Sequence, residues 1–424
     1  MTDSLPPPAQ RPHFSGWRVC SFAVLTQAIA IGFTLGAVGL FAAPLAEDFG
    51  MTATQFGLGV SGFSLVMNLS MPVIGGALDR GSIRVVMALG AACLSTSLAL
   101  LSFATELWQI GLLFCVGCSL GMAMLGPMAS STAMANWFDR LRGRALGLAN
   151  AGGPLGPFLI VPIAGVVLAE YGWRPTIQGF AVVAAVVGIP AARFGMIDRP
   201  SDVGQMPDGD APEAKRAGPG AASLGAQGNW DARAILRSRD FWFVALAAAP
   251  FGAQGIVLGA NAIPYLVHHG ASLQAASFVA VPMSVGAITG PLVFGALADR
   301  IHPRFLFIGL SAAICACFGL LATGPDYYPS LALFVVCGLV GGSMMPVYGA
   351  LIGRLFGVAA FGQVMGLAAL VGLPVIAAAP VLFGAAFDAT GDYSRGLFGL
   401  IGVLLVSIGL FSVLTGGTAR RRTD

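Results

Sequence analysis

The most prominent pattern along the chain is a series of long apolar runs separated by short polar segments. A helix needs roughly 20 apolar residues to cross the hydrocarbon core of a bilayer. Twelve runs reach about that length, at residues 19–45, 56–78, 83–103, 108–135, 145–168, 175–194, 241–267, 275–297, 305–322, 331–355, 364–387 and 396–415. The pattern predicts an all-α integral membrane protein with twelve transmembrane helices, six in each half.

A short charged segment between two apolar runs occurs twice. Residues 75–84 read GGALDRGSIR and residues 295–304 read GALADRIHPR, and the aspartates are 299 − 79 = 220 positions apart. Offsets of 220 and then 219 also relate Gly32/Gly252, Gly39/Gly259, Pro44/Pro264, Gly50/Gly270, Ser64/Ser284, Pro127/Pro346 and Gly147/Gly366. A repeat placed identically in both halves predicts two pseudo-symmetric six-helix bundles, as in transporters with parallel repeats.

The repeat and the loss of hydrophobicity near the middle of the chain divide it into five parts. We expect an N-terminal segment at 1–16, a first bundle at 17–194, a flexible linker at 195–240, a second bundle at 241–416 and a tail at 417–424. The linker is rich in Gly, Ala and Pro without a period. A short surface helix is expected at 229–238.

Composition supports the membrane interpretation and sets the orientation. The 424 residues are 56% hydrophobic and 10% charged, against about 25% charged in soluble domains, and the mean hydropathy is +0.83. Twenty of the 22 Lys and Arg residues lie in the termini, in alternate loops or at the span ends facing them. The positive-inside rule therefore predicts a multi-pass protein of the bacterial cytoplasmic membrane with both termini cytoplasmic. The net charge of +3 is a topology signal and does not indicate nucleic-acid binding.

Enzymatic and metal chemistry have little support in the sequence. The seven cysteines fall within or at the edges of apolar runs, where a thiol acts as a small hydrophobe, and Cys115-x-x-Cys118 lies mid-helix. The four histidines are not spaced as metal ligands or as part of a triad. We expect no catalytic residues, no metal and no cofactor.

The doubled Gly-x-x-x-Asp-Arg signature, the six-plus-six layout and the central linker resemble the major facilitator superfamily over essentially the whole chain. Further segments are similar to the bacterial monocarboxylate-porter branch with its oxalate/formate-antiporter relatives: Gly16-Trp17-Arg18-Val19, Asn136-Trp137-Phe138, Arg142-Gly143-x-Ala145-x-Gly147, Tyr171-Gly172-Trp173-Arg174 and Arg199-Pro200-x-Asp202. The resemblance implies two bundles around a central cavity and transport by rocking without ATP.

The resemblance also implies a gate on the linker side. Asp79 and Asp299 would each cap a helix N-terminus in the opposite bundle, near Gly362 and Gly143 respectively, and an anion is stabilised there. The alternative is that these aspartates only hold their own turns. The residues assigned to this gate are Asp79, Arg80, Arg84, Asp299, Arg300 and Arg304.

On the opposite side the 220 offset makes Asp48 and His268 equivalent. We consider a pH-sensitive Asp48–His268 latch there, and the alternative is two unrelated loop residues. Glu170/Arg174 and Asp388/Arg395 are expected to form matching loop ion pairs.

The span interiors contain no Lys, Arg, Asp or Glu. A buried charge is the usual sign of an ion or proton path, so the sequence favours a neutral or weakly charged solute over a carboxylate. The superfamily resemblance implies that runs 1, 4, 7 and 10 line the cavity. The candidate substrate contacts are Gln27, Thr34, Gln254, Asn261, Tyr265 and Tyr348. For each, an interhelical hydrogen bond is the alternative.

The leading hypothesis is a secondary transporter that takes up a monocarboxylate-like or a neutral, aromatic, vitamin-like nutrient. The alternative is an efflux antiporter for hydrophobic or organic compounds, because Gly153-Pro154 and Gly156-Pro157 partly match an antiporter motif. A transceptor or membrane enzyme would need a sensing domain or a catalytic set. The expected partners are the substrate, the lipid bilayer and a proton or counter-transported solute, with the protein as a monomer.

Overall fold

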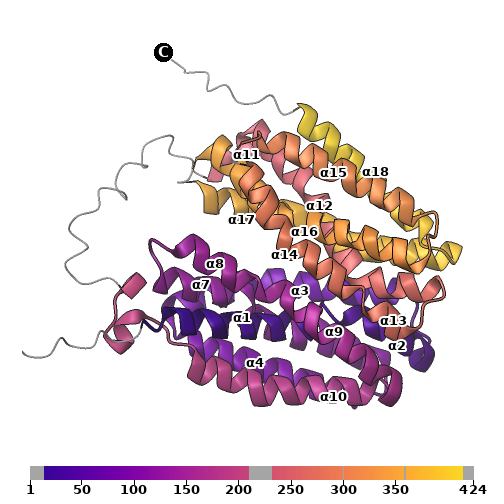
Figure 1. Ribbon diagram of the computed structural model, residues 1–424, viewed down its shortest axis with the longest axis horizontal. Coiled ribbons are helices and arrows are strands. Elements are labelled where there is room, and N and C mark those ends of the chain that lie inside the picture. The colour runs from indigo at the N-terminus through magenta and orange to yellow at the C-terminus, as the bar shows by residue number, and fades with distance from the viewer. Residues whose placement is uncertain (1–13, 210–231, 299, 358–359, 414–424) are drawn as a thin grey trace, which may run out of the picture.

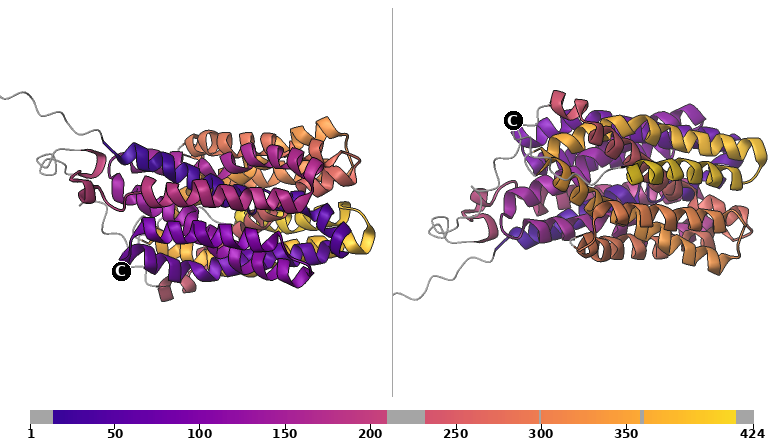
Figure 2. Two further views of the ribbon diagram at one scale, coloured as in Figure 1. Left: turned by 90° about the horizontal axis from the view of Figure 1, so that it is seen from below. Right: turned by 90° about the horizontal axis from the view of Figure 1, so that it is seen from above.

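The structure is a computed structural model that describes residues 14–209, 232–298, 300–357 and 360–413. All regular elements in these residues are helical. The first half of the chain forms one bundle and the second half forms another, and the bundles lie side by side (Figure 1). Two further views show the helices of both bundles following the same long axis (Figure 2). The expected all-α architecture of two helical bundles is confirmed.

The N-terminal bundle contains ten α-helices and four short helical segments. They are α1 (Gly16–Gly32), η1 (Val38–Phe41), α2 (Ala42–Phe49), α3 (Ala53–Arg80), α4 (Ile83–Leu101), α5 (Leu107–Leu112), η2 (Leu113–Cys118), α6 (Ser119–Leu125), α7 (Pro127–Trp137), α8 (Arg142–Asn150), α9 (Gly152–Tyr171), α10 (Trp173–Val183), η3 (Ala184–Gly188) and η4 (Ala191–Gly195). Here η2, η3 and η4 are π-helical and η1 is a 3₁₀-helix.

The linker region and the C-terminal bundle follow. The linker region contributes η5 (Pro200–Val203), η6 (Pro207–Gly209) and α11 (Ala232–Arg237). The C-terminal bundle consists of α12 (Arg239–His268), α13 (Leu273–Ser277), α14 (Ala280–Ala298), α15 (Pro303–Leu321), α16 (Tyr327–Phe356), α17 (Phe361–Thr390) and α18 (Ser394–Val413). The short helix expected at 229–238 corresponds to α11.

The first apolar run is an interrupted helix rather than one continuous span. Eleven helical spans in the described residues are long and apolar enough to cross a membrane, and α1 is a shorter apolar helix. After Gly32 the chain turns before η1 and α2 continue it. Close contacts surround this break: a Cβ at Gly36 would lie 2.6 Å from Pro157 Cγ, and one at Gly39 would lie 2.6 Å from the Ala260 carbonyl oxygen. The glycines therefore permit a break packed against helices of both bundles.

Glycines in α9 serve close packing against α1. A Cβ at Gly152 would lie 2.4 Å from the Val24 carbonyl oxygen, and one at Gly156 would lie 2.3 Å from that of Ala28. Such approaches are possible only without a side chain. Gly156, which belongs to one of the two Gly-Pro pairs considered as an antiporter motif, thus has a packing role in this fold.

Part of the expected flexible linker is held against the N-terminal bundle. The Trp137 indole donates to the Ile197 carbonyl at 2.9 Å, and the Arg84 N–H donates to Asp198 Oδ1 at 2.9 Å. Asp208 accepts hydrogen bonds from consecutive backbone N–H groups in the loop before α8, at residues 139, 140 and 141. Residues 197–208 are therefore docked on the bundle that precedes them.

Candidate transport pathway between the two bundles

The bundles meet at the end opposite the linker region, which we call the far end, and their ribbons diverge toward the linker end (Figure 1). At the far end Val38 of η1 and Phe56 and Val60 of α3 form a buried apolar cluster with Ala260 of α12. Ile256 of α12 packs against this cluster. Apolar side chains from both bundles therefore close the space between α12 and the break in the first span.

Two seams between helices of opposite bundles flank this apolar cluster, and both depend on glycine. In the first seam, formed by α3 and α17, a Cβ at Gly57 would lie 2.3 Å from the Pro380 carbonyl oxygen, and one at Gly384 would lie 2.2 Å from that of Ala53. In the second seam, formed by α9 with α13 and α14, a Cβ at Gly165 would lie 2.3 Å from Ser277 Oγ. Backbones from the two bundles thus come into direct contact.

The first seam also contains hydrogen bonds between the bundles. Asp388, in the last turn of α17, accepts from the Ala53 N–H at 2.9 Å and from the Thr54 N–H at 2.8 Å. It also accepts a hydrogen bond from the Thr54 hydroxyl. The expected Asp388/Arg395 ion pair is therefore wrong, because the Asp388 carboxylate caps the N-terminus of α3.

Two of the candidate substrate residues keep buried amide atoms without a hydrogen-bond partner. Gln27 on α1 is 3% exposed and Gln254 on α12 is 1% exposed. The carbonyl oxygen of Gln27 and both polar atoms of Gln254 make no hydrogen bond. A buried polar group without a partner costs about 1–3 kcal/mol, so each such amide calls for an explanation. A ligand that donates and accepts hydrogen bonds would provide one.

The other four candidates have local partners or apolar surroundings. The Tyr265 hydroxyl donates to the Leu321 carbonyl at 2.6 Å, and Asn261 donates to the Val257 carbonyl of its own helix at 2.9 Å. The Tyr265 bond, from α12 to the last residue of α15, is the interhelical hydrogen bond given as the alternative, whereas the Asn261 bond stays within α12. Tyr348 is buried with its ring 6.2 Å from that of Phe307.

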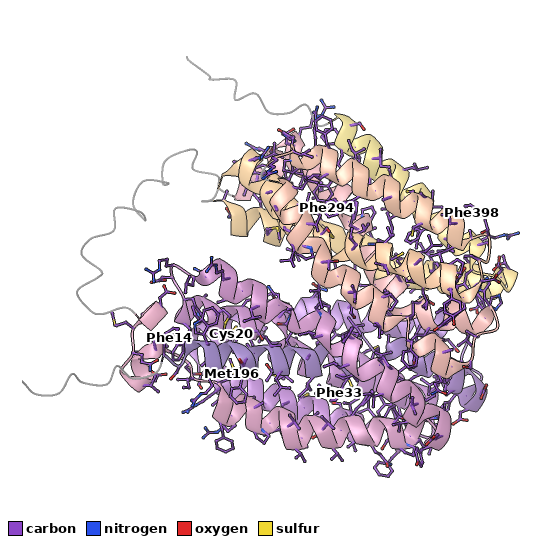
Figure 3. All side chains as sticks on the ribbon, viewed as in Figure 1. Phe14, Cys20, Phe33, Met196, Phe294 and Phe398 are labelled. Carbon is purple, nitrogen blue, oxygen red and sulfur yellow. The ribbon has the colours of Figure 1, made fainter. Side chains whose placement is uncertain are left out.

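Thr34 lies inside the N-terminal bundle. Its hydroxyl donates to the Ala30 carbonyl at 2.6 Å and lies 3.2 Å from Met122 Sδ. The residue borders an apolar cavity of about 290 Å³ formed by the broken first span, α3, α4, α5, η2 and α10. Phe33, stacked on Phe180 at 4.5 Å, lines the same cavity and lies in the interior of the bundle (Figure 3).

The expected gate on the linker side is only partly visible. Asp299 and the side chain of Asp79 lie outside what the structure describes. Arg80 and Arg300 are exposed at the linker end, and the Arg304 guanidinium lies 4.5 Å from the Phe305 ring centroid. The capping role of the two aspartates therefore stays a prediction.

The structure does not bring Asp48 and His268 together as the latch considered for them would require. Asp48 accepts a hydrogen bond from the Trp173 indole at 2.8 Å and forms a salt bridge with Arg174 at 3.0 Å, both within the N-terminal bundle. These contacts, the indole first, lower the pKa of Asp48. Arg174 is thus the partner of Asp48, and the suggested Glu170/Arg174 pair is replaced.

His268 lies among groups of its own bundle. Its ring packs 5.4 Å from that of Phe387 and 5.5 Å from that of Tyr393. The Ser394 hydroxyl, which donates to Asp392, and the charge of His268 lower the pKa of Asp392. The equivalence of Asp48 and His268 in the repeat therefore does not bring them together.

Comparison with known proteins gives the class. The sequence model of the Major Facilitator Superfamily matches residues 23–380. A solved structure of similar fold is a bacterial homologue of the human lysosomal transporter Spinster, with a TM-score of 0.71, 16% identity, and coverage of 95% of this chain and 97% of that one. The chain belongs to the Major Facilitator Superfamily.

Relatives of known sequence are transporters of several kinds. The chain is 23% identical to the uncharacterized MFS-type transporter YcxA of Bacillus subtilis, over 88% of each protein. It is 29% identical to human monocarboxylate transporter 11, over 96% of this chain and 84% of that protein. It is also 29% identical to riboflavin transporter RibJ of Trypanosoma brucei, over 49% of this chain and 39% of that protein. The relatives thus include proteins named for carboxylates and for a heterocyclic vitamin.

The sequence did not predict that Asp388 binds the N-terminus of α3 in the opposite bundle. The residue was assigned to a loop pair because Arg395 follows it in the chain, and nothing local indicates that its partner is 334 positions away. One signal was present: Thr52-x-x-Gln55 is a capping box, which marks a helix N-terminus that attracts anions.

Proposed function

We propose that the protein is a secondary active transporter that moves a small organic solute across the cytoplasmic membrane by alternating access, with the linker end in the cytoplasm. Membership of the superfamily supports transport, and the distribution of Lys and Arg supports the orientation. The solute is a neutral or weakly charged, vitamin-like or aromatic nutrient, and the direction is uptake.

The unpartnered buried amides of Gln27 and Gln254 carry this proposal. An amide both donates and accepts hydrogen bonds, so it pairs well with amide, imide or ring-nitrogen groups. A carboxylate enclosed beside either amide would need a cation, and the span interiors contain no Lys or Arg. The likeness to a riboflavin transporter agrees with a neutral heterocycle, whereas the likeness to a monocarboxylate transporter keeps monocarboxylates on the test panel.

The proposal is tested with purified protein in liposomes. Uptake of radiolabelled riboflavin, other neutral vitamins and monocarboxylates is measured with and without an imposed pH gradient. Saturable uptake of a neutral heterocycle supports the proposal, and uptake confined to monocarboxylates overturns the substrate class. If the solute instead leaves the cytoplasmic side only in exchange for a proton or another solute moving the opposite way, the efflux alternative is established.

Gln254→Leu and Gln27→Leu test the two amides directly. Each removes hydrogen bonds to the solute, so we expect transport to fall about three- to tenfold. The melting temperature of the ligand-free protein should stay constant or rise, because an unpaired buried polar group is removed.

Asn68→Leu on α3 is the matched control, because the Asn68 amide donates to the Ser64 carbonyl of its own helix at 2.8 Å and the residue is not among the candidate substrate contacts. It should leave uptake nearly unchanged. Loss of stability together with transport in the glutamine variants would show that the amides serve folding and would contradict the proposed contacts.

A further inference from the structure

We infer that Asp388 is a positioning residue of the far-end gate: by capping the N-terminus of α3 from the opposite bundle, its carboxylate stabilises the state in which the far end is closed. The inference rests on the proposed alternating-access function. It concerns the equilibrium between the two states of the gate, and substrate recognition plays no part in it.

The backbone donors at the start of α3 show what Asp388 supplies. Four N–H groups at a helix start have no partner within the helix. In α3, the Gln55 N–H donates to the Thr52 hydroxyl oxygen, and the Thr52 N–H donates to the Gln55 side chain. The N–H groups of Ala53 and Thr54 are the ones that donate to Asp388. The helix therefore has its own capping box, and Asp388 completes the set from the other bundle.

The charge of Asp388 favours this position over any position free of α3. The residue lies in the last turn of α17, where the helix dipole opposes a negative charge, and its carboxylate meets the N-terminus of α3, where the dipole stabilises one. When the seam opens, the carboxylate loses its favourable interaction with the N-terminus of α3 and keeps its unfavourable one with the C-terminus of α17. The contact is thus specific to the closed state, unlike a bond inside one bundle.

Opening of the first seam separates Asp388 from Ala53 and Thr54, because the donors and the acceptor belong to different bundles. Gly384 lies one turn before Asp388 on α17 and lets that helix approach the Ala53 carbonyl. Ala53 and Thr54 both move with the N-terminal bundle, and Asp388 moves with the C-terminal bundle. Any rocking that widens the first seam therefore breaks all three hydrogen bonds at once.

The test follows closure of the far end without using a substrate. Val60, 1% exposed in the apolar cluster between the bundles, is changed to cysteine, and its reaction rate with a bulky maleimide is measured in nanodiscs. Protein without this change gives the background of the seven native cysteines. Asp388→Asn should raise the labelling rate about two- to fivefold at low salt. The increase should shrink near 1 M salt, because exposed charge interactions are screened.

Two further variants separate the charge from local structure. Thr54→Val removes the hydroxyl hydrogen bond and keeps the backbone ones, so a smaller increase in the same direction is expected. Asp392→Asn removes a nearby charge whose hydrogen bonds stay within its own bundle, so its labelling rate should equal that of the parent.

The inference is overturned if Asp388→Asn leaves labelling unchanged, if its effect is equal at both salt concentrations, or if Asp392→Asn matches it. A lowered melting temperature with an unchanged labelling rate would likewise assign Asp388 a purely structural role. If labelling follows the expectation in a protein that transports nothing, the Asp388 cap is supported and the proposed function is contradicted, so the two failures are distinguishable.

Discussion

The two far-end seams are equivalent in the repeat, yet they are held together differently. Adding 220 to Gly57 of the first seam gives Ser277 of the second, and adding 219 to Gly165 of the second gives Gly384 of the first. Both seams use these positions for close helix contact. Subtracting 219 from Asp388, however, gives Ala169. The duplication retained small residues at the contact, whereas the carboxylate cap is present in one copy alone.

The difference between the two seams separates the features of a gate that the symmetry of the bundles requires from those that it does not. Two bundles that rock about a common axis must approach closely on both sides, so small residues are needed in both seams. Under the proposed alternating-access function, a carboxylate cap such as that of Asp388 would adjust how long the closed state lasts, and one cap would be enough for that purpose. The seams also differ in what the glycine faces: backbone oxygens in the first seam and the Ser277 side chain in the second.

The largest effect is expected from Gly384→Val in the first seam. Its Cβ would lie 2.2 Å from the Ala53 carbonyl oxygen, and backbone cannot rotate away as a side chain can. Overpacking of this kind costs about 1–3 kcal/mol, or roughly 5–150-fold in the closed population. We expect faster labelling of Val60→Cys by a factor in that range, with a matching loss of transport.

Gly366→Val is the control for that substitution, because it lies on the same helix and a Cβ there meets nothing within 4 Å. It carries the same change in helix propensity, so it separates that effect from the seam contact. Equal labelling in the two variants would show that the close approach of α3 and α17 does not decide closure.

Gly165→Val in the second seam is expected to lower transport less than Gly384→Val, and a second substitution should rescue the loss. The obstructing atoms belong to the Ser277 side chain, with Oγ at 2.3 Å and Cβ at 2.4 Å from the added Cβ. The double variant Gly165→Val with Ser277→Gly removes both atoms and should restore most of the transport. If the double variant is no better than the single one, backbone rather than side-chain contact controls this seam, and the contrast between the seams disappears.

Much of the fold could be predicted because it depends on patterns spread over many residues. Run length, the 220 offset and the placement of Arg residues each use dozens of positions, so local exceptions do not disturb them. The break after Gly32 could not be read in this way. The break packs closely against Pro157 of α9 and Ala260 of α12, and the sequence of an apolar run does not show which distant residues will lie beside it.

The candidate site was harder to predict because residue type does not reveal a partner. Gln254 and Asn261 are both amides on α12, yet the Asn261 amide bonds one turn back along its own helix while the Gln254 amide has no partner. Asp48 and Asp388 are both far-end carboxylates, and one binds within its bundle while the other crosses to the opposite one. Only the packed structure separates the members of each pair.

The smallest effect is expected from Asp48→Asn, which tests whether any far-end carboxylate would act as Asp388 does. Asp48 binds Trp173 and Arg174 within the N-terminal bundle, so labelling of Val60→Cys should not change. Stability at pH 7 should fall slightly, because the pKa of Asp48 is lower in the folded protein than its ordinary value. A depressed pKa stabilises the folded state fully above the unfolded value of about 3.9, and this contribution is lost as the pH falls from there through the lower pKa of the folded protein.

Melting temperatures of the parent and Asp48→Asn should therefore differ at pH 7, and the difference should begin to narrow as the pH falls below about 3.9. A gap that does not narrow at all below that pH would mean that the contact acts through packing of the Arg174 guanidinium, which lies 4.2 Å from the Trp173 ring centroid, rather than through the carboxylate charge. Faster labelling of Val60→Cys in Asp48→Asn would instead show that negative charge anywhere at the far end favours closure. In that case the cap on α3 would have no special role, and the first seam would differ from the second by charge alone.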